Sequence, residues 1–133
     1  MRPPERQHLR PMALLLGSNI TPEANLAAAL FELGRRFPLL RASRLWESPA
    51  VGSEGPDFLN MAVLILAGPV TFDLKHGVLR PIEAGLGRVR TSDKFAPRTI
   101  DIDVVADAGR ALDPGLWKFA HAAVPVAEIL PDL

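Results

Sequence analysis

Residues 58–67 read Phe58-Leu-Asn-Met-Ala-Val-Leu-Ile-Leu-Ala67, a run of ten residues with one polar side chain. Because alternate side chains of an extended chain point to opposite faces of a sheet, Asn60 shares a face with the even-numbered residues that follow it. The odd-numbered residues from Met61 onward occupy the other face. Both faces are largely apolar, which is typical of a strand inside a sheet. The run therefore predicts a central strand.

Two further strands and a helix are predicted before this run. An apolar stretch at residues 13–17 stops at Gly-Ser-Asn and reads as a buried strand that ends in a turn. Thr21 is a candidate N-cap, and Pro22 suits the first helical position. Apolar residues then recur at helical spacing, which predicts an amphipathic helix over residues 22–36. A second extended stretch covers residues 40–48 and breaks at Pro49, where a turn-rich loop begins.

A second helix and a last strand follow the central run. The helix is predicted over residues 71–87, capped by Thr71 and closed by Gly87, with one apolar face: Leu74, Val78, Ile82 and Leu86. Pro81 falls inside it and predicts a kink between residues 77 and 81. Residues 99–105 read Thr-Ile-Asp-Ile-Asp-Val-Val and predict a strand. The order βαββαβ indicates an α+β fold with helices packed on an antiparallel sheet.

Composition limits the possible classes of protein. The 133 residues are 48% hydrophobic and 23% charged, which predicts one folded domain over residues 12–133 after a flexible tail at residues 1–11. Fifteen basic and fifteen acidic residues give a net charge of zero, so no nucleic-acid partner and no membrane binding is expected. The absence of cysteine excludes disulfides, thiolate metal sites and a cysteine nucleophile. No leader of signal-peptide form and no long apolar run is found, and the expected location is the cytoplasm.

The last strand carries the most suggestive chemistry. Asp101 and Asp103 are two residues apart, so their carboxylates share one face about 6.6 Å apart, close enough to converge on Mg²⁺. An ordinary solvated strand face would look the same. Residues 80–98 hold five basic residues and two acidic ones, a local charge of +3 directly before the pair. Carboxylates for a metal beside guanidinium groups for phosphate favour nucleotide chemistry, with a charged loop of no special use as the alternative.

Phe58 and Asn60 also share one strand face, where a ring and an amide could stack on and hydrogen-bond a flat heterocycle. A core position is the alternative for Phe58. RNA binding by the sheet is a further alternative, but it requires exposed aromatic residues and a broad basic face. Aromatic residues make up only 6% of the chain, which argues against it.

Several motifs together resemble one enzyme family. Leu16-Gly-Ser-Asn19, Glu47-Ser-Pro-Ala-Val-Gly52, Pro56-Asp-Phe-Leu-Asn60, Leu86-Gly-Arg-Val-Arg90 and Ala96-Pro-Arg-Thr-Ile-Asp-Ile-Asp103 occur in the order and approximate spacing of 6-hydroxymethyl-7,8-dihydropterin pyrophosphokinases. The resemblance covers about residues 12–133. It implies a ferredoxin-like α/β/α sandwich. It also implies transfer of pyrophosphate from ATP, the co-substrate, to the pterin hydroxymethyl group, with release of AMP, in folate biosynthesis.

The resemblance also implies residue roles in a monomer or homodimer. The residues matching the catalytic positions are Arg88, Arg98, Asp101 and Asp103, and the last two match the ligands of two Mg²⁺ ions. The residues matching ATP-binding positions are Glu83, Arg88, Arg90, Lys94, Arg98, Val104 and His121. The residues matching pterin-binding positions are Ser48, Pro49, Val51, Phe58, Asn60 and Phe95.

The chain departs from the family pattern in two places. Only three residues separate His121 from Pro125, where the family has several more, including an arginine and the second aromatic wall for the pterin. Lys94 and Phe95 replace a pair that is usually Arg-Trp, and lysine is a point charge without the arginine fork. Reduced activity is therefore expected. The alternative function is a non-catalytic relative that binds nucleotide or pterin as a sensor or partner module.

Overall fold

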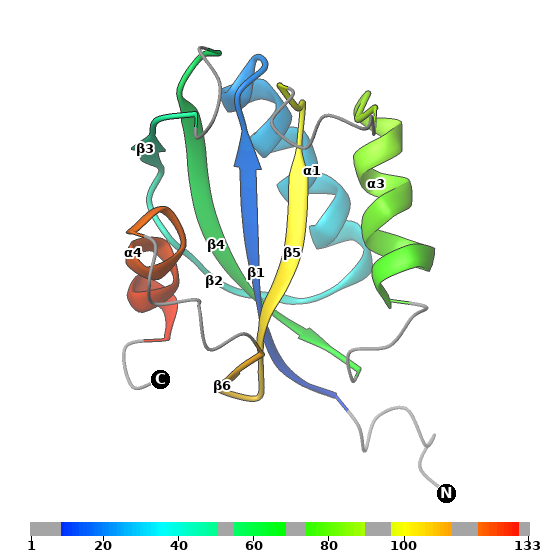
Figure 1. Cartoon of the computed structure of the whole chain (residues 1–133). Coiled ribbons are helices and arrows are strands. Elements are labelled where there is room, and N and C mark those ends of the chain that lie inside the picture. Colours follow the sequence, from blue (N-terminus) through cyan, green and yellow to red (C-terminus); the bar gives the residue numbers. More distant parts are fainter. Residues whose placement is uncertain (1–8, 51–54, 69–73, 90–96, 113–119, 131–133) are drawn as a thin grey trace, which may run out of the picture.

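A computed structural model describes residues 9–50, 55–68, 74–89, 97–112 and 120–130, and its centre is one antiparallel sheet (Figure 1). The strands are β1 (Arg10–Ser18), β2 (Leu39–Ala42), β3 (Trp46–Ser48), β4 (Phe58–Ala67), β5 (Asp101–Asp107) and β6 (Arg110–Ala111). Their order is β2-β4-β1-β5-β6, and β3 also pairs with β4. The α+β prediction with a mainly antiparallel sheet is confirmed.

The predicted central strand is β4, which has the expected bounds and lies between β1 on one side and β2 and β3 on the other. Two predicted boundaries are corrected. Arg10 and Pro11 belong to β1, so the sheet begins inside the stretch predicted to be a tail. Arg10 is held there by an ion pair with Asp107 of β5 at 3.0 Å. The last strand, predicted from residue 99, begins at Asp101.

The single strand predicted over residues 40–48 is two strands, β2 and β3, and that prediction is corrected. Ser43 lies between them. Its backbone N–H donates to the carbonyl of Ala62 at 2.8 Å, and its hydroxyl oxygen accepts from the Ala62 N–H at 2.9 Å. A side chain thus replaces one backbone partner, which interrupts the regular ladder while the chain stays attached to β4.

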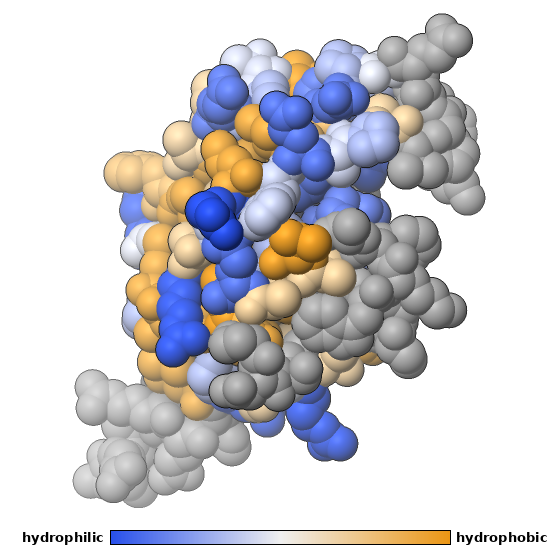
Figure 2. Space-filling view, turned by 90° about the vertical axis from the view of Figure 1, so that its left-hand side faces the viewer, coloured by the Kyte–Doolittle hydropathy of each residue, from blue (hydrophilic) through white to orange (hydrophobic). Residues whose placement is uncertain are grey.

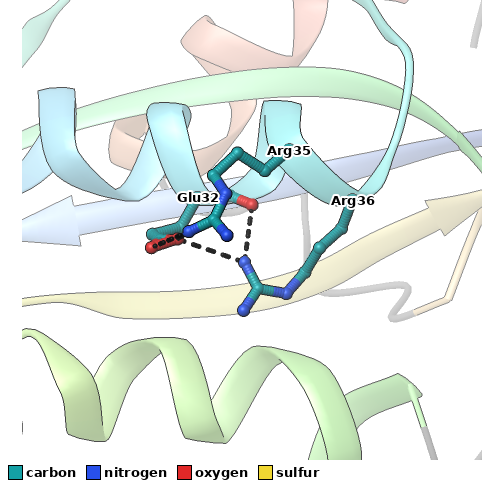
Figure 3. Close-up of polar contacts among 3 residues, drawn as sticks. All are labelled: Glu32, Arg35 and Arg36. Atoms are coloured by element: carbon teal, nitrogen blue, oxygen red, sulfur yellow. Dashed lines mark hydrogen bonds and ion pairs between the residues drawn. The ribbon is translucent and has the colours of Figure 1, made fainter.

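Helix α1 (Pro22–Arg36) has the predicted bounds, with Leu26, Ala29 and Leu33 buried beneath it. Thr21 is the N-cap residue, as predicted, but it has a positive φ of 42° and its side chain does not make the expected capping hydrogen bond. At the other end of the helix, Glu32 pairs with Arg35 and Arg36 at 3.2 Å each (Figure 3). These basic residues lie in the last turn, where positive charge stabilises the helix dipole.

The second predicted helix is continuous from a π-helical segment η2 (Lys75–Leu79) into α3 (Arg80–Gly85). The π-helical turn overlaps the interval 77–81 where a kink was predicted and begins two residues earlier, and the Arg80 N–H donates to the carbonyl of Lys75. Proline cannot donate a backbone hydrogen bond and clashes with the preceding turn, and the wider turn accommodates it. The predicted cap, Thr71, lies outside the described residues.

Helices cover both faces of the sheet. Helices α1 and α3 pack on one face, and α4 (Ala120–Ile129) packs on the other (Figure 1). Met12, Leu14 and Leu16 of β1 lie in the first core, and Ala13 lies in the second core with buried residues of α4. The expected α/β/α sandwich is thus present. No helix within the described stretches has both the length and the apolar character needed to span a membrane.

Strand β2 forms one edge of the sheet, and all four of its residues are exposed. Figure 2 faces this side of the molecule, where apolar and polar side chains alternate at the surface. Leu39 and Leu40 are among the exposed large apolar residues.

Candidate functional site

The candidate site lies where β1 ends. Because β1 is antiparallel to both neighbours, its last residues lie beside the first residues of β4 and β5. Gly17 pairs with Asn60 of β4 and with Asp101 of β5. Strands are spaced about 4.8 Å apart, so Asn60 and Asp101 are separated by about 10 Å across Gly17. Residues far apart in sequence are thus brought together on one end of the sheet.

The side chains of Asn60 and Asp101 point to the same face of the sheet. Leu14, Leu16 and their partner Ile102 belong to the core beneath α1 and α3. Side chains alternate along a strand, so Gly17, Asp101 and Asn60 face the side that carries α4. In Figure 1 the first turn of α4 is directed toward the end of the sheet at which β4 and β5 begin. Asp103 is hydrogen-bonded to the side chain of Asp101, which confirms that the two aspartates share one face.

Asn60 is held in a fixed orientation. The residue is 4% exposed, and its Nδ2 donates to the carbonyl of Trp46 at 3.1 Å and to the hydroxyl of Ser48 at 2.8 Å. A Cβ atom on Gly17 would lie 3.2 Å from its Oδ1 atom. Glycine at position 17 therefore leaves room for the Asn60 carbonyl, and Ser48 supports the amide from β3.

The carboxylates of Asp101 and Asp103 repel each other. Asp101 is half-buried and Asp103 is exposed at the residue level. The pKa of Asp103 is raised from 3.8 to about 7. The largest cause is desolvation of the Asp103 carboxyl group, followed by repulsion from Asp101 and by a hydrogen bond with Asp101. The charge of Glu83 acts in the same direction, and Lys75 acts against it. The positive charge near the two carboxylates is therefore too small to keep the pKa of Asp103 at its ordinary value.

Arg98 connects the aspartates with the aromatic side of the site. Its Nη1 atom lies 3.6 Å from Oδ2 of Asp101, and its guanidinium carbon lies 5.7 Å from the centre of the Phe58 ring. The side chain as a whole is 21% exposed. A cation between a carboxylate and an aromatic face is held by both charge and ring quadrupole. Arg98 therefore lies between the predicted metal and pterin positions.

Glu83 supports β5 from the helix side. It is 1% exposed, and its Oε2 accepts the backbone N–H of Ile102, the residue between the two aspartates, at 2.8 Å. Gly87, with φ of 90°, follows α3, and a Cβ there would lie 3.7 Å from the Thr99 side chain. The end of α3, with the half-buried Arg88, is thus close to the start of β5.

The remaining predicted residues are distributed as follows. Pro49 is exposed after β3, and Val104 packs partly against the core beneath α1 and α3. His121 is half-buried in the first turn of α4. The residues that lie outside the described stretches are Val51, Arg90, Lys94 and Phe95.

Two residues near the site were not singled out from the sequence. Lys75 affects the pKa of Asp103, although helical periodicity gave it no special position. Asn19 is 4% exposed and hydrogen-bonded to both sides of the site. Its position in the motif Leu16-Gly-Ser-Asn19 could have drawn attention to it, but the motif alone does not identify its hydrogen-bond partners.

The donor set fits a metal that takes further ligands from a substrate. The described residues contain no group of three or more histidine, aspartate or glutamate side chains arranged to hold a metal ion. Mg²⁺ is commonly held by one or two carboxylates together with substrate phosphates and water. Asp101 and Asp103, with their excess of negative charge, meet that requirement when a polyphosphate supplies the remaining ligands.

Comparison with known proteins agrees with this chemistry. The family model for 7,8-dihydro-6-hydroxymethylpterin-pyrophosphokinase matches residues 13–131. A 2-amino-4-hydroxy-6-hydroxymethyldihydropteridine pyrophosphokinase of Methylorubrum extorquens is 38% identical, over 89% of this chain and 81% of the relative. Proteins with the same name from Synechocystis and Pseudomonas aeruginosa are 33% and 32% identical. This chain spans 65% of the Synechocystis protein and 79% of the Pseudomonas protein.

Proposed function

Because this chain belongs to the 7,8-dihydro-6-hydroxymethylpterin-pyrophosphokinase family, we propose that it transfers pyrophosphate from ATP to 6-hydroxymethyl-7,8-dihydropterin in folate biosynthesis. The observation that carries the proposal is the position of Arg98, 3.6 Å from the Asp101 carboxylate and 5.7 Å from the Phe58 ring centre. A phosphate-binding group thus joins a carboxylate pair to an aromatic surface, and the reaction requires all three.

The bond changes are those of a single displacement. The hydroxymethyl oxygen of the pterin forms a bond to the β-phosphorus of ATP, and the bond from that phosphorus to the α,β-bridging oxygen breaks. AMP leaves with the electron pair, and the hydroxyl proton is released to solvent. Such transfers depend mainly on alignment and on stabilisation of charge spread over phosphate oxygens. Arg98, with Arg88, is the group proposed to stabilise that charge.

The pterin side of the site orients the acceptor alcohol. The ring would stack on Phe58, and the Oδ1 atom of Asn60 would accept a hydrogen bond from the ring edge. Because both described contacts of the Asn60 amide use its Nδ2 atom, the oxygen is the end with remaining capacity. Val51, Pro49 and Phe95 are the further proposed pterin contacts.

Asp101 and Asp103 are proposed to hold two Mg²⁺ ions. When bound, Mg²⁺ neutralises phosphate charge and lowers the pKa of the attacking alcohol. The proposed ATP contacts besides the two arginines are Glu83, Arg90, Lys94, Val104 and His121. The short stretch between His121 and Pro125 supports a rate below that of longer relatives. We further propose a cytoplasmic monomer or homodimer.

The test is direct assay of the chain with ATP, Mg²⁺ and hydroxymethyldihydropterin. AMP and the pyrophosphorylated pterin should appear in equal amounts. Asp101→Asn and Asp103→Asn should each lower the rate by about 100-fold or more. Asp107→Asn is the matched control on the same strand, because Asp107 pairs with Arg10 at the far end of β5, and it should retain the rate. Binding of both ligands without AMP would instead select a non-catalytic relative.

A further inference from the structure

Asn19, the residue directly after β1, is hydrogen-bonded to both loops that enter the site. Its Oδ1 accepts the backbone N–H of Arg98 at 2.8 Å, and its own N–H donates to the Arg98 carbonyl at 3.1 Å. Its Nδ2 donates to the carbonyl of Pro56 at 3.2 Å. The residue is 4% exposed. One buried amide thus joins two segments that lie 37 and 79 residues after it in the chain.

The orientation of this amide is fixed by its partners. A backbone N–H can only donate and a carbonyl can only accept, so Oδ1 must face Arg98 and Nδ2 must face Pro56. The loop around it is also constrained, because the Ser18 hydroxyl and the Asn25 amide both donate to the carbonyl of Ile20, at 3.1 and 2.6 Å. Asn19 is therefore a fixed point between two loops.

Each loop leads directly into one half of the site. Pro56 lies two residues before Phe58, on the proposed pterin side. Arg98 is the proposed phosphate-binding residue and lies three residues before Asp101. A shift of the Asn19 amide would move these halves relative to each other, while the strand pairing within each half would be kept.

We infer that Asn19 is a positioning residue that sets the alignment of the two substrates, an inference that rests on the proposed function. Asn19 acts through the backbones of Arg98 and Pro56 and is not assigned a contact with substrate. Loss of this link should lower the rate of the bound complex more than the affinity for either ligand alone. Misalignment of about 1 Å between reacting groups can lower a rate by about 100-fold.

Three variants separate this role from simple loss of stability. Asn19→Ala removes both side-chain hydrogen bonds. Asn19→Asp keeps an acceptor for the Arg98 N–H but replaces the donor to Pro56 by an oxygen. Ser43→Ala is the matched control: Ser43 is 8% exposed, and its hydroxyl also makes two hydrogen bonds, one of them to β4, away from both loops.

The measurements are kcat, the separate Kd values for pterin and for a non-hydrolysable ATP analogue with Mg²⁺, the melting temperature, and amide hydrogen exchange. Asn19→Ala should lower kcat by roughly 10- to 100-fold and change each Kd by less than about 3-fold. Exchange should accelerate at Arg98, Asp57 and Phe58. Asn19→Asp should accelerate exchange at Asp57 and Phe58 but not at Arg98. Ser43→Ala should lower the melting temperature comparably and keep kcat within about 2-fold.

Three results would overturn the inference: an unchanged kcat in folded Asn19→Ala, an equal fall of kcat in Ser43→Ala, or a rise of both Kd values that accounts for the lost activity. A wild-type chain that makes no AMP would refute the proposed function separately. The exchange data would then decide alone, and faster exchange in only one loop of Asn19→Ala would count against the link.

Discussion

Removal of the Glu83 carboxylate should loosen the strand that carries the two aspartates. Glu83 is 1% exposed and accepts the Ile102 N–H at 2.8 Å, from the side of β5 that faces away from β1. In Glu83→Ala this N–H remains buried, because Ile102 is 3% exposed, and it loses its acceptor. In Glu83→Gln the side chain keeps an oxygen that can accept the same hydrogen bond and loses only the charge.

The magnitudes follow from these contacts. A buried donor without a partner costs about 1–3 kcal/mol, and one lost buried methylene adds about 0.8 kcal/mol. Relief of repulsion with Asp103 offsets part of this cost. The net loss for Glu83→Ala should therefore be about 2–3 kcal/mol of unfolding free energy, or roughly 6–9 °C in melting temperature for a domain of this size. Glu83→Gln should stay within about 1 kcal/mol of wild type.

The assay is thermal and urea unfolding of the three proteins at pH 7 with EDTA, so that no metal contributes. Equal destabilisation by both variants would show that the charge of Glu83 matters and its hydrogen bond does not. A Glu83→Ala protein as stable as wild type would refute the assignment of Glu83 as the support of β5. Hydrogen exchange at Ile102 gives an independent measurement, since only the alanine variant should expose that amide.

Three further outcomes are expected. Since the folded-state pKa of Asp103 is about 7, above its ordinary 3.8, the metal-free protein should lose stability as pH rises between these values, and thermal unfolding of Asp103→Asn should lack that loss. Although desolvation opposes it, hydrogen bonding from Trp46 lowers the pKa of Glu128, so Glu128→Gln should be less stable than wild type at pH 7, and this difference should shrink as the pH falls through the acidic range in the same assay. Gly17→Ala should weaken pterin binding by about tenfold in a fluorescence titration by crowding the Asn60 oxygen, whereas Gly68→Ala, with open space at its Cβ position, should not.

Elements with a strong local pattern were predictable from the sequence. Helix α1 and strand β4 have the expected bounds because periodicity and burial agree along their whole length. The split between β2 and β3 was not predictable, since it depends on hydrogen bonds between Ser43 and Ala62. Helix α4 was missed because Pro125 argues against a helix. Its stability comes from tertiary burial of Ala122, Val126 and Ile129 against the sheet.

The residues that carry the chemistry of the site were easier to predict than the residues that hold them in place. Asp101 and Asp103 could be assigned to one face from strand alternation alone. The contact between Arg98 and Phe58 joins the loop before β5 to the first residue of β4, and spacing in the sequence carries no information about it. Asn19 and Glu83 act on the backbone of distant segments, and such partners become visible only when the chain is folded.

The topology explains why one short strand end can organise a two-substrate site. Gly17 has Asn60 on one side and Asp101 on the other, so the distance between the two halves is set by two strand spacings. Backbone hydrogen bonds fix these spacings more firmly than any loop could. The loops need to control only the direction of approach, and Asn19 is located where β1 ends and both loops arrive. A side chain at position 17 would fill the space between the halves, and a missing amide at position 19 would leave their relative angle unrestrained. Gly17 and Asn19, two residues apart, thus serve two separate requirements, room for the ligand and alignment of the loops, which the proposed variants test one at a time.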